Sequence, residues 1–173
     1  DWLPVFRQIA IDGKVPFEEL NCYPIKYDKS WKVTTLDDED GHPFLFYLTE
    51  GRHEISMTVK LGPITEVVQS LNRDIRLLSN IIRQIIMITG DTPDVNYNYE
   101  LEINIPNLIS DFELLADSMQ RNAKFLNQIS TKSPSIANNF LLIKDQIERM
   151  IKNPFSIPKN MNDLDNALTS LGT

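Results

Sequence analysis

Residues 61–90 read LGPITEVVQSLNRDIRLLSNIIRQIIMITG, and this stretch decides the fold. Upstream of Gly62 apolar residues alternate with polar ones, whereas downstream they recur every three or four positions. The downstream stripe consists of Val68, Leu71, Ile75, Leu78, Ile82 and Ile85. This spacing predicts a long helix that begins after Pro63 and ends at Gly90. A second apolar stripe on the same helix predicts that it is covered on more than one side.

Three further segments downstream show helical spacing. The first runs from about residue 104 to 129, the second from about 134 to 153, and the third from 161 to 171. With residues 63–90 they predict an α-helical bundle of three to four helices. Polar Asn122 replaces one apolar member of its stripe, so we expect it to set the register between packed helices.

The alternating region predicts an antiparallel sheet. Residues 53–61 alternate most clearly, and residues 43–49 form a second run, so the two predict a β-hairpin that turns at Glu50-Gly51-Arg52. In this hairpin Phe44, Phe46 and Met57 are expected to point toward the core.

Shorter strands are predicted at residues 3–11 and 31–36, and the connection through Pro16, Pro24 and Tyr27 is expected to be irregular. The predicted fold class is therefore α+β, with an N-terminal antiparallel β-sheet followed by the helical bundle. The predicted domains are residues 1–62 and residues 63–173.

Composition excludes several classes of function. The net charge of −7 argues against a phosphate-binding surface, so no nucleic acid partner is expected. Cys22 is the only cysteine, which excludes an internal disulfide and a cysteine-based zinc site. No apolar run is long enough to span a bilayer.

Candidate catalytic and metal-binding groups are few. His42 and His53 lie near Asp37, Asp38 and Asp40, but the spacing of a calcium loop is absent, and a turn rich in Asp and Gly is an ordinary strand connection. We therefore expect no catalytic residue, no metal and no cofactor. Whether the acidic loop 37–40 binds Ca²⁺ is left open.

Exposed aromatic rings are the strongest candidates for a binding site. Sugar rings present apolar C–H faces that stack on Trp and Tyr, and Trp31, Tyr27 and Tyr23 are the predicted carbohydrate-binding residues. Packing in the core is the competing interpretation for each ring.

Several motifs resemble a known family. They are the Ile-Asp-Gly-Lys-x-Pro-Phe segment at residues 11–17, the Phe-Tyr-Leu-x-Glu-Gly-x-His segment at 46–53, Leu61-Gly62-Pro63 and the end of the first helix. Together they resemble the large extracellular solute-binding lipoproteins of Gram-positive sugar-uptake ABC transporters. In that family these segments belong to a galactose-binding-like jelly roll, followed by a helical bundle.

The resemblance implies a function, a location and a set of partners. It implies a non-catalytic accessory domain of an extracellular, cell-surface-attached solute-binding protein that recognises carbohydrate and contacts other domains of a longer chain. A jelly roll has about eight strands, and residues 1–62 supply only four or five. A homodimer formed through the incomplete sheet is therefore a further expectation.

Two other classes of function remain open. The amphipathic helices suit a structural or protein-interaction spacer with no ligand of its own. An enzyme fragment ranks last, because no nucleophile lies near a general base in the sequence.

Overall fold

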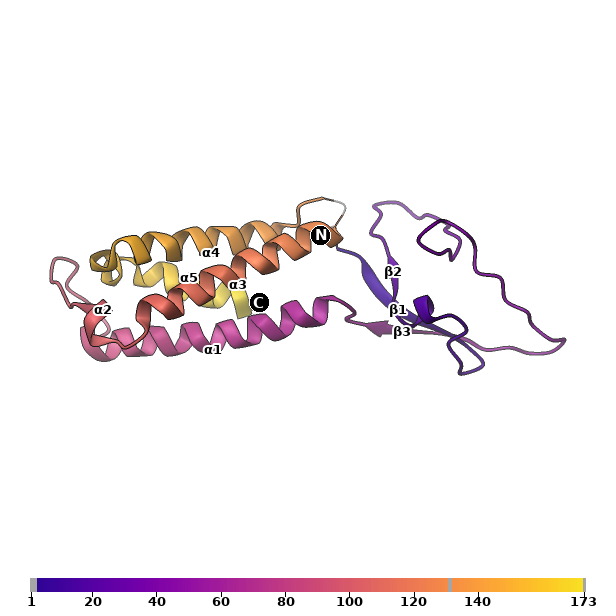
Figure 1. The fold of residues 1–173 in the computed structure, drawn as a ribbon, viewed down its shortest axis with the longest axis horizontal. Coiled ribbons are helices and arrows are strands. Elements are labelled where there is room, and N and C mark those ends of the chain that lie inside the picture. Colours follow the sequence, from indigo (N-terminus) through magenta and orange to yellow (C-terminus); the bar gives the residue numbers. More distant parts are fainter. Residues whose placement is uncertain (1–2, 131, 173) are drawn as a thin grey trace. The chain divides into compact units, whose positions relative to one another are not determined.

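The computed structural model describes residues 3–130 and 132–172. The chain divides into two units, one comprising Asp1–Thr65 with Ile129–Lys132 and the other Glu66–Gln128 with Ser133–Thr173. The first contains the sheet and the second the helical bundle (Figure 1). The predicted α+β class, an antiparallel sheet followed by a helical bundle, is confirmed.

The sheet has three antiparallel strands in the order β2-β1-β3. Strand β1 spans Val5–Ile11, β2 spans Tyr23–Ile25 and β3 spans Ile55–Lys60, with a 3-10 turn, η1, at Glu18–Asn21. Ile9 is paired with Met57. The strands predicted over residues 3–11 and 53–61 are therefore confirmed.

The predicted hairpin is wrong. Residues 43–49 form no strand, and β3 pairs with β1 instead. The rings of Phe44 and Phe46 pack on Phe17, with centroids 4.8 and 5.7 Å from its ring. These ring contacts replace the cross-strand pairs that the alternation predicted.

Two other local predictions also fail. Residues 31–36 form no strand, and the connection expected to be irregular contributes β2. Pro24 is tolerated in β2 because this strand lies at an edge of the sheet, where a missing N–H does not interrupt a ladder on both sides. Met57, which was predicted to face the core, is 59% exposed, because no second layer covers β3 among the described residues.

The helical unit has four helices of twelve or more residues. They are α1 at Ile64–Thr89, α3 at Leu108–Ile129, α4 at Ser135–Lys152 and α5 at Met161–Gly172. A short helix, α2, spans Leu101–Asn104, and 3-10 turns at Pro154–Ser156 and Pro158–Asn160 lead into α5. The predicted bundle is confirmed, and α1 ends at Thr89, directly before Gly90, whose φ is +76° and whose N–H donates to the carbonyl of Ile86.

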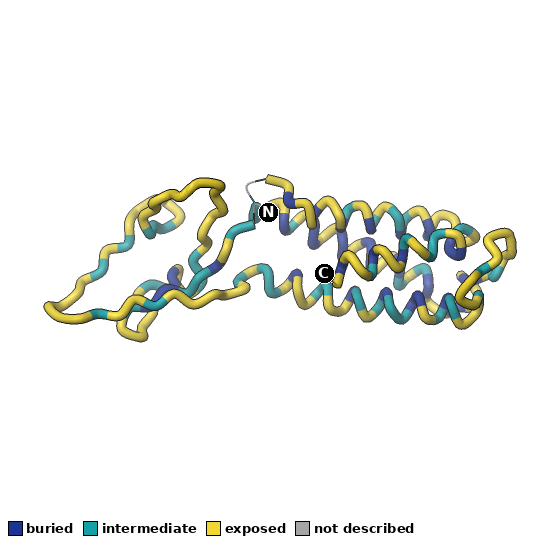
Figure 2. Tube along the Cα trace, turned by 180° about the vertical axis from the view of Figure 1, so that it is seen from behind, coloured by how far each residue is buried: buried dark blue, intermediate teal, exposed yellow. Residues whose placement is uncertain are grey.

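The core of this unit lies between the four helices. In Figure 2 their buried positions line the inside of the bundle. Buried side chains come from every one of these helices, including Ile81, Ile85, Leu115, Met119, Phe140, Ile147 and Leu164. Burying apolar side chains at this spacing is what holds four amphipathic helices together.

Candidate functional site

Trp31 and Tyr27 lie in the irregular segment that follows β2. The Trp31 side chain is fully exposed, and Tyr27 is 45% exposed. No strand or helix is formed by residues 26–36, so this segment presents its rings outside the sheet. An exposed indole offers both faces to an apolar or C–H surface.

Tyr23 lies in a different environment. It lies in β2, is half-buried, and its hydroxyl donates to Oδ1 of Asp37 at 3.0 Å while accepting from the Asp37 N–H at 3.3 Å. Burial raises the pKa of Tyr23. Asp37 also forms an isolated β-bridge with Pro43, so the hydrogen bonds of Tyr23 connect the loop between these two residues to the sheet.

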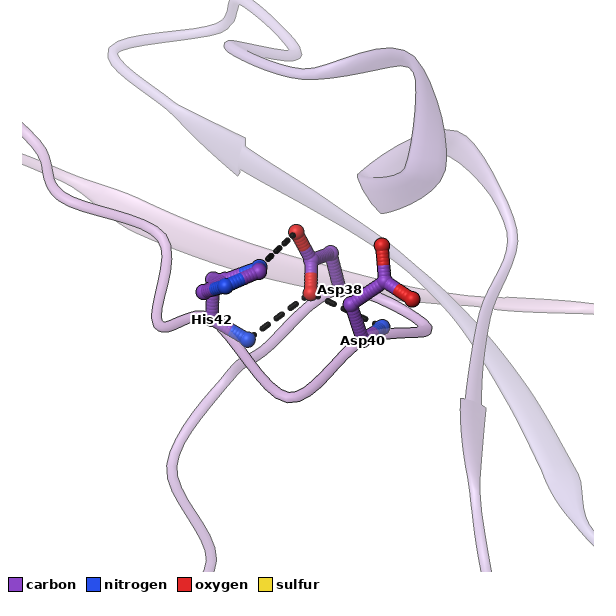
Figure 3. A group of neighbouring side chains, drawn as sticks. All are labelled: Asp38, Asp40 and His42. Carbon is purple, nitrogen blue, oxygen red and sulfur yellow. Dashed lines mark hydrogen bonds and ion pairs between the residues drawn. The ribbon is translucent and has the colours of Figure 1, made fainter.

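Asp38, Asp40 and His42 gather in that loop (Figure 3). Asp38 Oδ1 accepts from the N–H groups of Asp40 and His42 at 3.0 and 2.8 Å, and Oδ2 lies 3.2 Å from His42 Nδ1. The backbone hydrogen bond from His42 is the main cause that lowers the pKa of Asp38. These bonds describe a closed turn, which is the ordinary interpretation of this sequence.

The two motif segments meet through Asp12 and His53. Asp12 Oδ2 lies 2.6 Å from His53 Nδ1, while His53 Nε2 lies 2.8 Å from the carbonyl oxygen of Thr49. A carbonyl only accepts, so Nε2 donates, and Nδ1 faces a carboxylate; both ring nitrogens are therefore donors in the imidazolium form.

Both groups titrate away from their usual values. The hydrogen bond to Asp12, followed by that to Thr49, raises the pKa of His53. The hydrogen bond to His53, followed by that from the Glu54 N–H, lowers the pKa of Asp12. Asp12 has a φ of +51° at the turn after β1, so this ion pair joins the turn to the segment that precedes β3.

The helical unit contains a buried polar cluster, defined by Ser70, Asp74, Ser118 and Asn122. Ser118 donates to Asp74 Oδ2 at 2.6 Å, and therefore accepts from Ser70 at 2.9 Å. Asn122 Nδ2 donates to Ser70 at 3.1 Å. The donors thus form a chain that ends on the Asp74 carboxylate.

The sequence pattern singled out Asn122 from this cluster but missed Ser70, Ser118 and the carboxylate of Asp74. Asp74 is only 7% exposed, and burial raises its pKa against the opposing effect of Ser118, Ser70, Arg73 and Arg121. The position of Asp74 in α1 could have indicated its burial, since it lies seven residues after Val67 and four before Leu78, both of which are buried. Asn122 is buried in the same cluster and bonds across to α1, as a register-setting residue would.

The described surface also has a recess between α3 and α4. Its volume is about 390 Å³, and it is lined by Glu113, Ala116, Asp117, Glu148, Ile151 and Lys152. No predicted carbohydrate-binding residue lines it.

Comparison with known families identifies the helical unit. The family model described as "Bacterial solute-binding protein, 4-helix bundle domain" matches residues 66–172. This match covers more than half of the chain, which therefore belongs to that family. Searches of curated proteins and of solved structures found no significant match.

Family membership confirms the predicted resemblance to solute-binding proteins of ABC transporters. The chain is part of a bacterial solute-binding protein of the kind that serves ABC transporters, and the helical bundle is an accessory domain of such a protein. Among the described residues, every helix is too short or too polar to cross a membrane.

Proposed function

We propose that this chain is a non-catalytic, carbohydrate-recognising accessory region of an extracellular, surface-attached solute-binding protein of a sugar-uptake ABC transporter. The boundary at residues 62 and 63, with a separate sheet domain and bundle domain, is part of this proposal. The family match supports the transporter context of the bundle. The full exposure of Trp31 supports the carbohydrate-recognising role of the N-terminal residues.

Trp31 carries the binding proposal because nothing in the fold requires its exposure. Burial of a tryptophan contributes strongly to stability, and a large ring in an irregular segment is ordinarily packed against something. Here the indole lies open to solvent, next in the chain to Ser30, whose N–H and hydroxyl both bond to Asp28. Tyr27 supplies a second ring four residues earlier.

Calorimetric titration with a panel of oligosaccharides tests the proposal. Trp31→Ala should abolish measurable heat for the sugar that binds, Tyr27→Ala should weaken binding about tenfold, and Trp31→Phe should retain part of it, since the phenyl ring keeps an aromatic face. None of these variants should lower the melting temperature appreciably, because an exposed ring contributes little to the core.

Tyr97 provides the matched control. It is an aromatic residue, 61% exposed, in the helical unit, so Tyr97→Ala should leave sugar binding unchanged. Equal losses for Trp31→Ala and Tyr97→Ala, or no heat with any sugar, would contradict carbohydrate recognition.

The second candidate function is that of a spacer or protein-interaction module. The observation that favours it is the 26-residue helix α1, whose length of about 39 Å can separate other domains of a longer chain. Absence of sugar binding together with capture of another domain of the same polypeptide would favour this function.

A further inference from the structure

One face of the sheet is largely apolar and carries exposed side chains on its edge strands, while Ile9 in the central strand is buried and Arg7 is the charged member of the face. In an antiparallel sheet, residues that pair directly carry their side chains on the same face. Val5 pairs with Ile25 and Ile11 with Ile55, while Met57 pairs with Ile9 in the central strand. The exposed apolar members of this face are Val5, Ile25, Ile55, Met57 and Val59.

The outer edge of β3 is also open. The N–H of Asp12 donates to the carbonyl oxygen of Glu54 at 2.8 Å, so the peptide groups of Glu54 face β1. Because peptide groups alternate along a strand, those of Ile55, Met57 and Val59 point away from β1. Among the described residues, no strand pairs with this side of β3.

The sequence of β3 is complementary to itself. If two copies run antiparallel about an axis through Met57, then Ile55 lies opposite Val59 and Glu54 lies opposite Lys60. The outward-facing peptide groups then form the hydrogen-bonded pairs of the new ladder. Glu54 and Lys60 occupy a non-hydrogen-bonded pair, where side chains approach most closely.

Neighbouring registers lack this complementarity. A shift by two residues in one direction places Lys60 opposite Arg52, and a shift in the other places Glu54 opposite Gly62. Like charges opposite one another destabilise a strand pair, whereas opposite charges stabilise it. The register centred on Met57 is thus favoured by charge as well as by the apolar face.

We propose that β3 is a homodimer interface. A second copy of this chain pairs with β3 about a two-fold axis at Met57, and the two three-stranded sheets become one sheet of six strands. Two Glu54–Lys60 pairs flank the axis, and the apolar faces of both sheets become continuous. An exposed edge with an apolar face is the standard template for such pairing. This proposal is independent of sugar binding.

Sedimentation of the 173-residue chain tests it directly. The expected result is a monomer–dimer equilibrium over about a hundredfold range of concentration, as mass action requires. Glu54→Lys and Lys60→Glu each place like charges opposite one another twice per dimer. Each should therefore weaken dimerisation about tenfold.

Two combinations test the register. The double variant E54K/K60E should recover dimerisation, because it restores opposite charges in both pairs. An equimolar mixture of E54K and K60E should form a heterodimer, since one copy then carries two lysines and the other two glutamates at the paired positions.

Glu113→Lys is the matched control, because it makes the same charge change at an exposed position of α3. It should leave dimerisation intact, which separates pairing at β3 from the change in net charge. A monomer at every concentration, or a folded double variant that fails to recover the dimer, would overturn the proposal.

Discussion

Gly62 occupies a position where no side chain fits. Its φ is +55°, and a Cβ there would lie 2.7 Å from Cys22 Sγ and 2.9 Å from Phe6 Cγ. Backbone strain and steric overlap add, so we expect Gly62→Ala to lower the free energy of unfolding of the sheet unit by about 2 to 4 kcal/mol. Urea denaturation followed by circular dichroism measures this loss.

Gly41 provides the control for Gly62. Its φ is +85°, and nothing lies within 4 Å of the position that a Cβ would take, so Gly41→Ala reports backbone strain alone, about 1 to 2 kcal/mol. Adding Cys22→Ala to Gly62→Ala should recover part of the difference. Equal losses at the two glycines would show that the contact with Cys22 and Phe6 does not matter.

The Asp12–His53 ion pair makes the sheet unit sensitive to pH. The pKa of His53 is raised in the folded chain, so its contribution is fully present below the unfolded value of about 6.5 and is lost as pH rises through the folded pKa. The pKa of Asp12 is lowered, so its contribution is lost only as pH falls through that lower value.

An NMR titration of the His53 ring measures this directly. We expect a pKa above 6.5 that falls toward 6.5 in Asp12→Asn, and faster exchange of the Glu54 N–H as His53 loses its proton, because that N–H donates to Asp12. The contact between His42 and Asp38, at 3.2 Å, should persist in Asp12→Asn. An unchanged His53 titration in that variant would contradict the ion pair.

At the scale of elements, local periodicity predicted the helices well and the sheet less well. The extents of α1, α4 and α5 and the end of α3 follow from apolar spacing and from Gly90, because a helix is satisfied by its own backbone hydrogen bonds. The start of α3 was predicted near residue 104 but lies at Leu108, and the short helix α2 was not predicted. Strand pairing depends on partners distant in sequence. Asp12 and His53 are 41 residues apart, and no local pattern indicates that they meet.

Contacts between residues distant in sequence also explain two other errors of the sequence analysis. Phe44 and Phe46 alternate as strand residues do, yet they pack on Phe17, which lies more than twenty residues earlier. Asp74 was overlooked because a carboxylate is ordinarily a surface group, and its burial is tolerable here because Ser118 on α3 donates to it.

Asp74 should govern the pH dependence of α1 packing against α3. Its pKa is raised in the folded bundle, so the contribution of this group is most favourable below the unfolded value of 3.8 and is lost as pH rises through the folded pKa. Asp74→Asn keeps an acceptor for Ser118 without the buried charge. It should raise the free energy of unfolding at pH 7 by about 1 kcal/mol and flatten its pH dependence.

Thermal unfolding of Asp74→Asn and Asp74→Ala between acidic and neutral pH distinguishes charge from hydrogen bonding. Asp74→Ala should destabilise by about 1 to 3 kcal/mol, because Ser118 then lacks its buried acceptor. Asp117→Asn, one residue before Ser118 at an exposed position of α3, is the charge-matched control. A variant Asp74→Asn that unfolds more easily at pH 7 would show that the charged carboxylate is the preferred acceptor.

At the scale of the whole molecule, the two units differ in how much core they possess. The sheet unit buries few large side chains, chiefly Phe6, Ile9 and Leu20, whereas the helical unit buries apolar residues along four helices. A small unit with a sparse core is marginally stable. We therefore expect thermal unfolding in two transitions, with the sheet unit melting first.

Concentration separates the two transitions further. If copies pair through β3, mass action stabilises the sheet unit, and its melting temperature should rise by several degrees over about a hundredfold increase in concentration. The helical transition should stay constant, and a fragment of residues 63–173 should reproduce it alone.

Calorimetry of the full chain, of this fragment and of Glu54→Lys measures all three effects. In Glu54→Lys the same rise of the lower transition should require about tenfold more protein, because dimerisation is weakened about tenfold while both folds persist. A single cooperative transition, absent from the fragment, would instead show that the bundle requires the sheet for folding.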